Sequence, residues 1–153
     1  MSLETKAAKH LLEGYNCAES VLLTFLEDWS QYFRIGVTPA AATAFGGGMG
    51  RMGHTCGALS GALMVIGLAV SRTEAKDDEG KKEAYKLAQE LFKRFEHRWG
   101  ALDCRELTQC DLSTEEGFSR YKELKIHETK CSEIVRGTTK ILTSIIKQTK
   151  KDP

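Results

Sequence analysis

Apolar residues recur every three or four positions through most of the chain, which is the spacing of amphipathic α-helices. The two clearest stripes lie within residues 18–33 and 134–146, and residues 76–99 carry a third in which charges of both signs surround the apolar positions. The chain has two prolines, which is few for the many turns that a many-stranded β fold needs. The pattern therefore predicts an all-α fold, a multi-helix bundle.

Capping residues indicate where several helices begin. Asn16 precedes the first stripe and Glu19 follows three residues later, the arrangement of a capping box. Thr38 and Pro39 form a second start signal, because proline suits the first helical position. Gly100 is placed to end the mixed-charge helix. Further helix starts are predicted at four capping residues: Thr55, Asp103, Ser113 and Thr129.

Length and charge narrow the functions that the chain can have. Its 153 residues suit one domain, which we assign to residues 4–149, with residues 1–3 regarded as a cloning remnant. There are 22 Lys and Arg against 21 Asp and Glu, a formal net charge of +1. A dedicated nucleic-acid binder would carry a clear basic excess, so this class of function is excluded.

The chain carries no recognisable secretory signal, and its most apolar stretch, residues 58–70, is too short to span a bilayer. We therefore expect a cytoplasmic protein without a membrane span. Cysteines in a reducing compartment are core residues, metal ligands or redox catalysts rather than structural disulfides. No Cys-x-x-Cys pair occurs, which excludes the usual zinc-ribbon and thioredoxin spacings.

Four of the five cysteines lie at predicted helix starts: Cys17, Cys56, Cys104 and Cys131. The unpaired N–H groups and the positive dipole end of a helix favour an anion, so a thiol in this position is expected to have a lowered pKa. The thiolate is both the nucleophile and the metal ligand. These four cysteines are therefore the redox candidates, with metal ligation as their alternative role. Cys110 lies in a loop without a preceding cap and is the weakest candidate.

A glycine-dense stretch, residues 46–53, precedes the helix predicted from Cys56. Glycine adopts positive φ readily and lets the backbone approach a ligand closely. We expect backbone amides of four glycines to support the sulfur site or a bound cofactor: Gly46, Gly47, Gly48 and Gly57. No Lys-Ser or Lys-Thr follows the stretch, so a nucleotide phosphate loop is excluded. Three glycines also recur every four residues, a spacing that permits close helix contact: Gly53, Gly57 and Gly61.

Two polar residues of the same stretch are minor candidates. His54 lies next to the cap of the Cys56 helix and is a minor candidate metal ligand. Arg51 is placed either to orient an anion or to pair with Glu19. The remaining histidines lie in polar contexts and are expected at the surface: His10, His97 and His127.

The run Cys56-Gly57-Ala58-Leu59-Ser60-Gly61, with the glycines before it, resembles the CGAxxG motif of the redox-active proteins called C_GCAxxG_C_C. Cys17, Cys104 and Cys131 are similar to the flanking cysteines of that family. The resemblance spans nearly the whole chain and the four cysteines match it without departure. The resemblance implies electron transfer or thiol exchange, and it does not indicate a substrate.

The leading hypothesis is that the four helix-start cysteines converge in one pocket. They would then act by thiol–disulfide chemistry or electron transfer, or through an iron–sulfur cluster or zinc, because four thiolates suit either metal centre. A redox partner or a small-molecule substrate is expected, and assembly into a homo-oligomer is left open.

Two alternatives remain at this point. The first is a dithiol pair, formed by Cys56 and one partner, that shuttles between thiol and disulfide. The second is a helical binding or assembly module in which the glycines serve close packing and the cysteines fill space.

Overall fold

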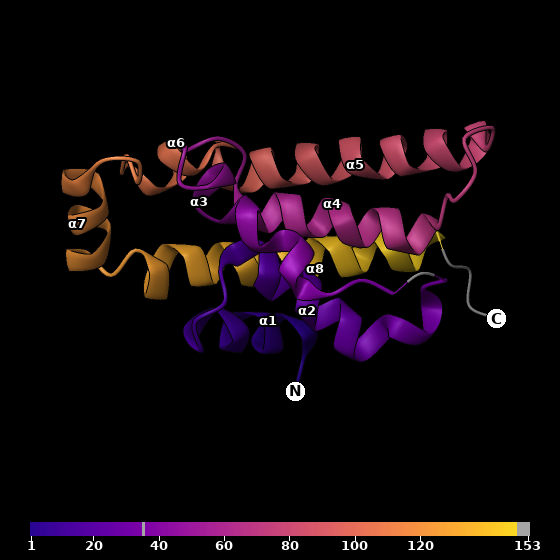
Figure 1. Ribbon diagram of the computed structural model, residues 1–153, viewed down its shortest axis with the longest axis horizontal. Helices are drawn as coiled ribbons and strands as arrows, with labels where there is room; N and C mark the ends of the chain where they lie inside the picture. The colour runs from indigo at the N-terminus through magenta and orange to yellow at the C-terminus, as the bar shows by residue number, and fades with distance from the viewer. Residues whose placement is uncertain (35, 150–153) are drawn as a thin grey trace.

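Three long helices, α4, α5 and α8, lie side by side along the molecule (Figure 1). The computed structural model describes residues 1–34 and 36–149. Its α-helices, in chain order, are α1 (Leu3–Leu12), α2 (Cys17–Trp29), α3 (Gly46–Met49), α4 (Gly57–Val70), α5 (Asp78–Trp99), α6 (Cys104–Thr108), α7 (Glu115–Glu123) and α8 (Ser132–Thr149). The 3₁₀ segments η1 (Ser30–Tyr32) and η2 (Pro39–Phe45) and the π-helical segment η3 (His127–Cys131) complete them. No strand occurs in the described residues, and the predicted all-α class is confirmed.

The long helices alternate in direction. α4 and α8 begin at the left end of the molecule in Figure 1, and α5 runs back toward that end. The short helices α3, α6 and α7 gather at the same end. Helix starts that are far apart in the sequence therefore come together at one end of the bundle.

The start signals at Asn16 and Thr38 are confirmed. The Glu19 N–H donates to the Asn16 side chain and the Asn16 N–H donates to the Glu19 carboxylate, each over 2.9 Å, which completes the capping box. The Thr38 hydroxyl accepts a backbone N–H and Pro39 opens η2, although this segment is 3₁₀ rather than α-helical. Gly100 ends α5 with a φ of 76°, as predicted.

Two other predicted caps are wrong. Cys56 itself, and not Thr55, is the N-cap of α4, and Thr114 rather than Ser113 caps α7. Thr55 is extended because it pairs with Asp103 in an isolated antiparallel bridge. Asp103 is the N-cap of α6, as predicted, but its side chain makes no capping hydrogen bond.

The contact between α2 and α4 depends on two glycines. A Cβ at Gly61 would overlap the Ala18 carbonyl oxygen and lie 3.0 Å from the Ala18 Cα. A Cβ at Gly57 would lie 3.2 Å from the Ala18 nitrogen. These two positions confirm the predicted close helix contact. Gly53, in contrast, lies in the loop before α4, with a φ of 77° and the Arg105 side chain against it.

Aromatic and branched side chains fill the space between the helices. Phe25 of α2 and Phe95 of α5 are fully buried, and each such side chain contributes about 1.5–3 kcal/mol by leaving water. The buried stripe of α5 is Leu87, Leu91 and Phe95, while its charged residues face solvent, as the mixed-charge pattern predicts. None of the described helices is both long and apolar enough to cross a membrane.

The glycine-dense stretch forms a left-handed turn. All five residues of Gly47–Arg51 have φ between 60° and 69°. Side chains disfavour this conformation by about 1–2 kcal/mol per residue, which explains why three of the five positions are glycine. Met49 and Arg51 adopt it with side chains. A 3.0 Å bond from the His54 N–H to the Gly48 carbonyl helps to close the turn.

We predict that Gly61→Ala destabilises the protein by about 1–3 kcal/mol, because the added methyl group meets the rigid backbone of Ala18 rather than a mobile side chain. Gly67→Ala is the matched control in the same helix. A Cβ at Gly67 meets nothing within 4 Å and its φ is not positive, so this change should stabilise by about 0.5–1 kcal/mol.

Urea unfolding of both variants measures the difference. Equal stability of the two variants would contradict the packing that we describe for α2 and α4.

Candidate functional site: a cluster of buried thiols

Four thiols from four parts of the chain line one small internal cavity: Cys17 of α2, Cys56 at the N-cap of α4, Cys104 of α6 and Cys131 of η3. The cavity has a volume of about 30 Å³, which is room for about one water molecule. The remaining lining residues are Gly47, Gly57, Leu107, Thr108, Leu112, Tyr121 and Ile134. The fold thus brings together all four cysteines that the sequence singles out.

A short stretch of paired backbone aligns Cys56 and Cys104. The Cys56 N–H donates to the Leu102 carbonyl over 2.9 Å, and the Cys104 N–H donates to the His54 carbonyl over 2.7 Å. Gly48 of the left-handed turn packs against the Cys104 side chain, since a Cβ at Gly48 would lie 2.7 Å from the Cys104 Cβ. The glycine turn and the bridge together hold the starts of α4 and α6 side by side.

Cys131 does not lie at a helix start, so this part of the prediction is wrong. Its N–H donates to the Ile126 carbonyl over 2.9 Å, the spacing of a π-helix, and η3 continues into α8. Thr129 does not cap α8 because its hydroxyl donates to the Lys125 carbonyl one turn back. Single π-helical turns occur frequently at functional sites.

Cys17 and Cys131 both line the inner cavity, and each shifts the pKa of the other. The interaction with Cys131 and burial raise the pKa of Cys17 well above its usual value. The interaction with Cys17 lowers the pKa of Cys131 against the effect of burial, and the Tyr121 hydroxyl, 3.4 Å from its sulfur, lowers it further. Glu128 raises this pKa and Lys130 lowers it. Of the two thiols, Cys131 therefore ionises more readily.

Cys56 and Cys104 are protonated at neutral pH. Burial raises the pKa of Cys56 to about 12, although two backbone N–H groups in the first turn of α4 oppose this effect. Burial raises the pKa of Cys104 to about 11, and the Thr108 hydroxyl opposes it. The expectation that helix starts lower the pKa of these thiols is wrong for Cys56 and Cys104, because removal from water is the larger effect. It is also wrong for Cys17, whose pKa is raised first by the interaction with Cys131 and then by burial.

A chain of hydrogen bonds leads from Cys131 toward the protein surface. The Tyr121 hydroxyl lies 3.4 Å from the Cys131 sulfur and 3.3 Å from Nδ1 of His127. Nε2 of His127 lies 3.0 Å from the Leu11 carbonyl oxygen, which can only accept, so Nε2 carries a proton. When Tyr121 donates to the Cys131 thiolate, its oxygen is free to accept from a doubly protonated His127. The chain can thus hold the proton that leaves Cys131.

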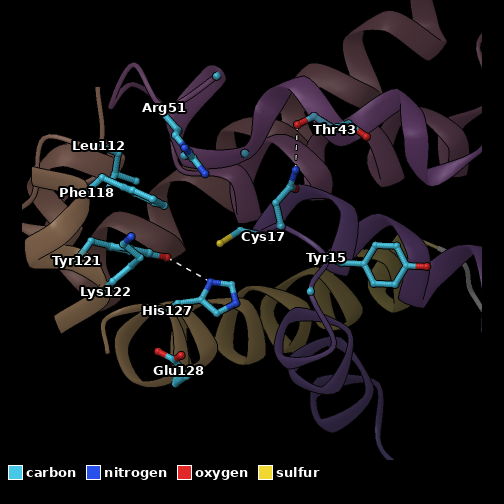
Figure 2. A pocket seen from close by; sticks show the side chains of 15 residues that line it. Tyr15, Cys17, Thr43, Arg51, Leu112, Phe118, Tyr121, Lys122, His127 and Glu128 are labelled. Carbon is cyan, nitrogen blue, oxygen red and sulfur yellow. Dashed lines mark hydrogen bonds between the residues drawn. The ribbon is translucent and has the colours of Figure 1, made fainter. Parts of the chain in front are cut away.

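An open cleft of about 800 Å³ adjoins the inner cavity. Cys17 and Tyr121 line both spaces, and so do Gly47 and Leu112. Figure 2 shows the Cys17 sulfur pointing into the cleft, with Arg51 on one side and His127 on the other. Cys17 is half-buried, whereas the other three thiols of the site are buried. A reagent entering the cleft therefore meets Cys17 first.

The four predicted backbone glycines all lie around the site. Gly57 lines the inner cavity, Gly46 the cleft, and Gly47 both. Gly48 is buried against Cys104. The amides that lower the pKa of a thiol belong to Ala58 and Leu59 of α4, so the role of the glycines in holding a cofactor stays a prediction.

Two minor candidates lie outside the cavity lining. The His54 side chain is exposed, and its backbone carbonyl is the part that contacts the site through Cys104. Cys110 is buried against Cys104 and Leu112, beside the cavity, and its N–H donates to the Thr108 hydroxyl.

Arg51 does not pair with Glu19. The Glu19 carboxylate is occupied by the Asn16 N–H and the Thr43 hydroxyl. The Arg51 guanidinium instead lies 4.1 Å above the centre of the Phe118 ring, at the rim of the cleft. The anion-orienting alternative for Arg51 is thus the one compatible with its position.

We tested whether the thiols fit an iron–sulfur cluster or zinc. A structural metal site of this kind needs three or four ligands that point to one centre. Over residues 1–34 and 36–149, no three His, Cys, Asp or Glu side chains are grouped so that they could hold a metal ion. In the described residues the four thiols therefore do not present a set of ligands around one metal centre.

Three of the site's polar residues carry no clear signal in the sequence: Tyr121, Lys122 and His127. His127, expected at the surface, is half-buried and bonded at both ring nitrogens, and His10 is buried beside Glu27. His97 is exposed as expected. One signal was present for His127, because it precedes Cys131 by four residues and shares a helix face with it. The misplaced helix start at Thr129 concealed that relation.

One family model matches the chain. It is described as "Putative redox-active protein (C_GCAxxG_C_C)" and matches residues 15–145. The matched range includes all four cysteines of the cavity. No curated protein and no solved structure matches the chain.

We predict that Tyr121→Phe raises the pKa of Cys131, because the thiolate loses a hydrogen-bond donor. Below the new pKa a smaller fraction of Cys131 is thiolate, so its alkylation slows near neutral pH. Well above both pKa values the rate should be unchanged. Peptide-resolved mass spectrometry of iodoacetamide labelling against pH gives the profile of Cys131 alone.

Tyr15→Phe is the matched control, since Tyr15 lines the same cleft and its hydroxyl contacts no cysteine. Identical Cys131 profiles in Tyr121→Phe and Tyr15→Phe would show that Tyr121 does not stabilise the thiolate.

Proposed function

The chain belongs to the C_GCAxxG_C_C family of redox-active proteins, and from this premise we propose that it is a thiol–disulfide redox protein whose reacting pair is Cys17 and Cys131. The observation that carries the proposal is that Cys17 and Cys131 line the same inner cavity, while Cys17 alone of its four cysteines also lines the cleft. Cys17 faces the cleft and Cys131 lies behind it. This is the arrangement of an attacking thiol backed by a resolving thiol.

The first step is attack on a disulfide R–S–S–R that enters the cleft. The Cys17 sulfur bonds to one substrate sulfur while its proton passes to the thiolate form of Cys131, the thiol whose pKa is lowered. The substrate S–S bond breaks, and the leaving R–S⁻ takes a proton from solvent. The product is a mixed disulfide between Cys17 and one half of the substrate.

The second step releases the other half. Cys131 loses its proton into the chain of Tyr121 and His127, and its sulfur attacks the Cys17 sulfur. A Cys17–Cys131 disulfide forms, and the second R–S⁻ leaves and is protonated. Two electrons have moved from the protein to the substrate, which becomes two thiols. Thiol–disulfide exchange with a reduced partner returns the protein to its starting state.

Cys56 and Cys104 have a secondary part in this proposal. Their high pKa values keep them as thiols, and the thiolate is the form that attacks a disulfide. They line the cavity on the side away from the cleft and provide a second pair that reacts at alkaline pH. We therefore propose Cys17 and Cys131 as the dithiol pair, in place of Cys56 and one partner.

The alternative of a binding module with structural cysteines has less support. This alternative requires that the glycines at helical spacing contact a partner. Gly57 and Gly61 instead pack against Ala18 within the fold. These glycines therefore leave no close-packing face for a partner helix.

We predict that a small disulfide converts the reduced protein to a form with one Cys17–Cys131 disulfide, identified by mass spectrometry of alkylated peptides. In Cys131→Ser the reaction should stop at the mixed disulfide on Cys17, because the resolving thiol is gone. Cys110→Ser is the matched control and should form the native disulfide. Accumulation of a different disulfide, or no trapped adduct on Cys17, would contradict the assigned pair.

We also predict that the protein purified without oxygen contains no stoichiometric iron, labile sulfide or zinc, because no described group of ligands fits a metal ion. Elemental analysis and visible absorption measure this. One zinc ion or an iron–sulfur cluster per chain that disappears in Cys17→Ser would replace thiol exchange by the metal-thiolate alternative.

A further inference from the structure

Two cationic side chains each lie against the same aromatic ring at the mouth of the cleft. The guanidinium carbon of Arg51 lies 4.1 Å from the centre of the Phe118 ring, and Nζ of Lys122 lies 4.6 Å from it. All three residues line the cleft that opens onto Cys17. Figure 2 shows them on the side of the cleft toward which the Cys17 sulfur points.

These two cations have no anionic partner in the part of the chain that the structure describes. The described ion pairs include neither Arg51 nor Lys122. Glu128 is the one carboxylate that lines the cleft with them. Like charges held at one ring repel each other, and an anion between them would remove that repulsion. The cleft therefore has a positive excess next to the thiol.

The position of Arg51 is built into the backbone. Its φ of 67° places it at the end of the left-handed turn, and its N–H donates to the Gly46 carbonyl over 3.2 Å. A non-glycine residue is uncommon in this conformation. The turn directs a guanidinium, the side chain best suited to a carboxylate, into the cleft.

We propose that the substrate of this cleft is a small disulfide that carries carboxylate groups. This inference rests on the proposed thiol–disulfide function and names its substrate class. A carboxylate of the substrate pairs with Arg51 or Lys122 in the cleft, and the S–S bond lies against Cys17. The volume of about 800 Å³ is within the range of small-molecule sites. The disulfide gains two electrons from Cys17 and Cys131 and leaves as two carboxylate-bearing thiols.

The test compares three disulfides of different charge on the reduced protein: dithiodipropionate, a dianion; bis(2-hydroxyethyl) disulfide, which is neutral; and cystamine, a dication. Each rate of Cys17–Cys131 disulfide formation is divided by the rate of the same disulfide with dithiothreitol, which removes intrinsic reactivity. We expect the dianion to react about tenfold faster than the neutral compound, and the dication more slowly. The preference should shrink as salt is added, because salt screens exposed charges.

The decisive variant is the double substitution Arg51→Gln with Lys122→Gln. In this variant the normalised rate with the dianion, divided by that with the neutral compound, should be close to one. Dividing by the rate with the neutral disulfide cancels any general effect of the substitutions on the thiols, and the far-UV circular dichroism spectrum shows whether the fold is intact. Lys93→Gln with Lys140→Gln is the matched control, because it removes the same charge from exposed positions on α5 and α8. This control should keep the tenfold preference.

The outcomes separate this inference from the function on which it rests. If the three normalised rates are equal in the native protein, or if the control loses the preference as fully as the Arg51 and Lys122 variant, the substrate class is wrong and thiol exchange stands. If none of the disulfides oxidises Cys17 and Cys131, the proposed function fails and the substrate class fails with it.

Discussion

The close contact between α2 and α4 is the constraint on which the site depends. Gly57 and Gly61 let the two helices approach until the backbone of Ala18 touches α4. A Cβ at Gly57 would also lie 3.2 Å from the Cys17 Cβ, so the same contact brings the starts of the two helices, and their cysteines, to one cavity. With larger side chains at Gly57 and Gly61 the two helices would have to move apart, and the thiols would move apart with them.

Ionisation of the thiols is decided by a competition between burial and hydrogen bonding. All four lie where water is largely excluded, which by itself favours the neutral thiol. At Cys56 and Cys104 burial is the larger effect, and the pKa values rise to about 12 and about 11. At Cys131 the interactions with the Cys17 thiol and the Tyr121 hydroxyl outweigh burial, so the pKa falls instead of rising. Hydrogen bonds to a charged acceptor in a low-dielectric interior are strong enough to do this. One thiol of lowered pKa therefore lies among thiols whose pKa values are raised.

The glycine-rich stretch links the architecture to this chemistry. Its left-handed turn packs Gly48 against the Cys104 side chain on one side, and on the other it carries Arg51 to the rim of the cleft. A right-handed turn in the same place would direct these side chains elsewhere. The density of glycine thus reflects a backbone conformation that side chains disfavour, and the two non-glycine residues retained in it mark where a side chain serves a purpose beyond the turn.

The sequence by itself determined the helices, because hydrophobic periodicity and capping act over a few residues and are independent of the rest of the chain. The capping box at Asn16, the end of α5 at Gly100 and the close-packing glycines of α4 are examples. It also singled out the four cysteines. Only the tertiary structure decided how each behaves, because burial and hydrogen-bond partners come from distant segments. The placement of Cys17 with Cys131 in one cavity, the contact of Tyr121 with the Cys131 sulfur, and the stacking of Arg51 on Phe118 join residues whose spacing in the chain follows no helical or strand period. Local rules misjudged the thiol pKa values for the same reason: a helix start is visible in sequence, whereas the loss of water around it is not.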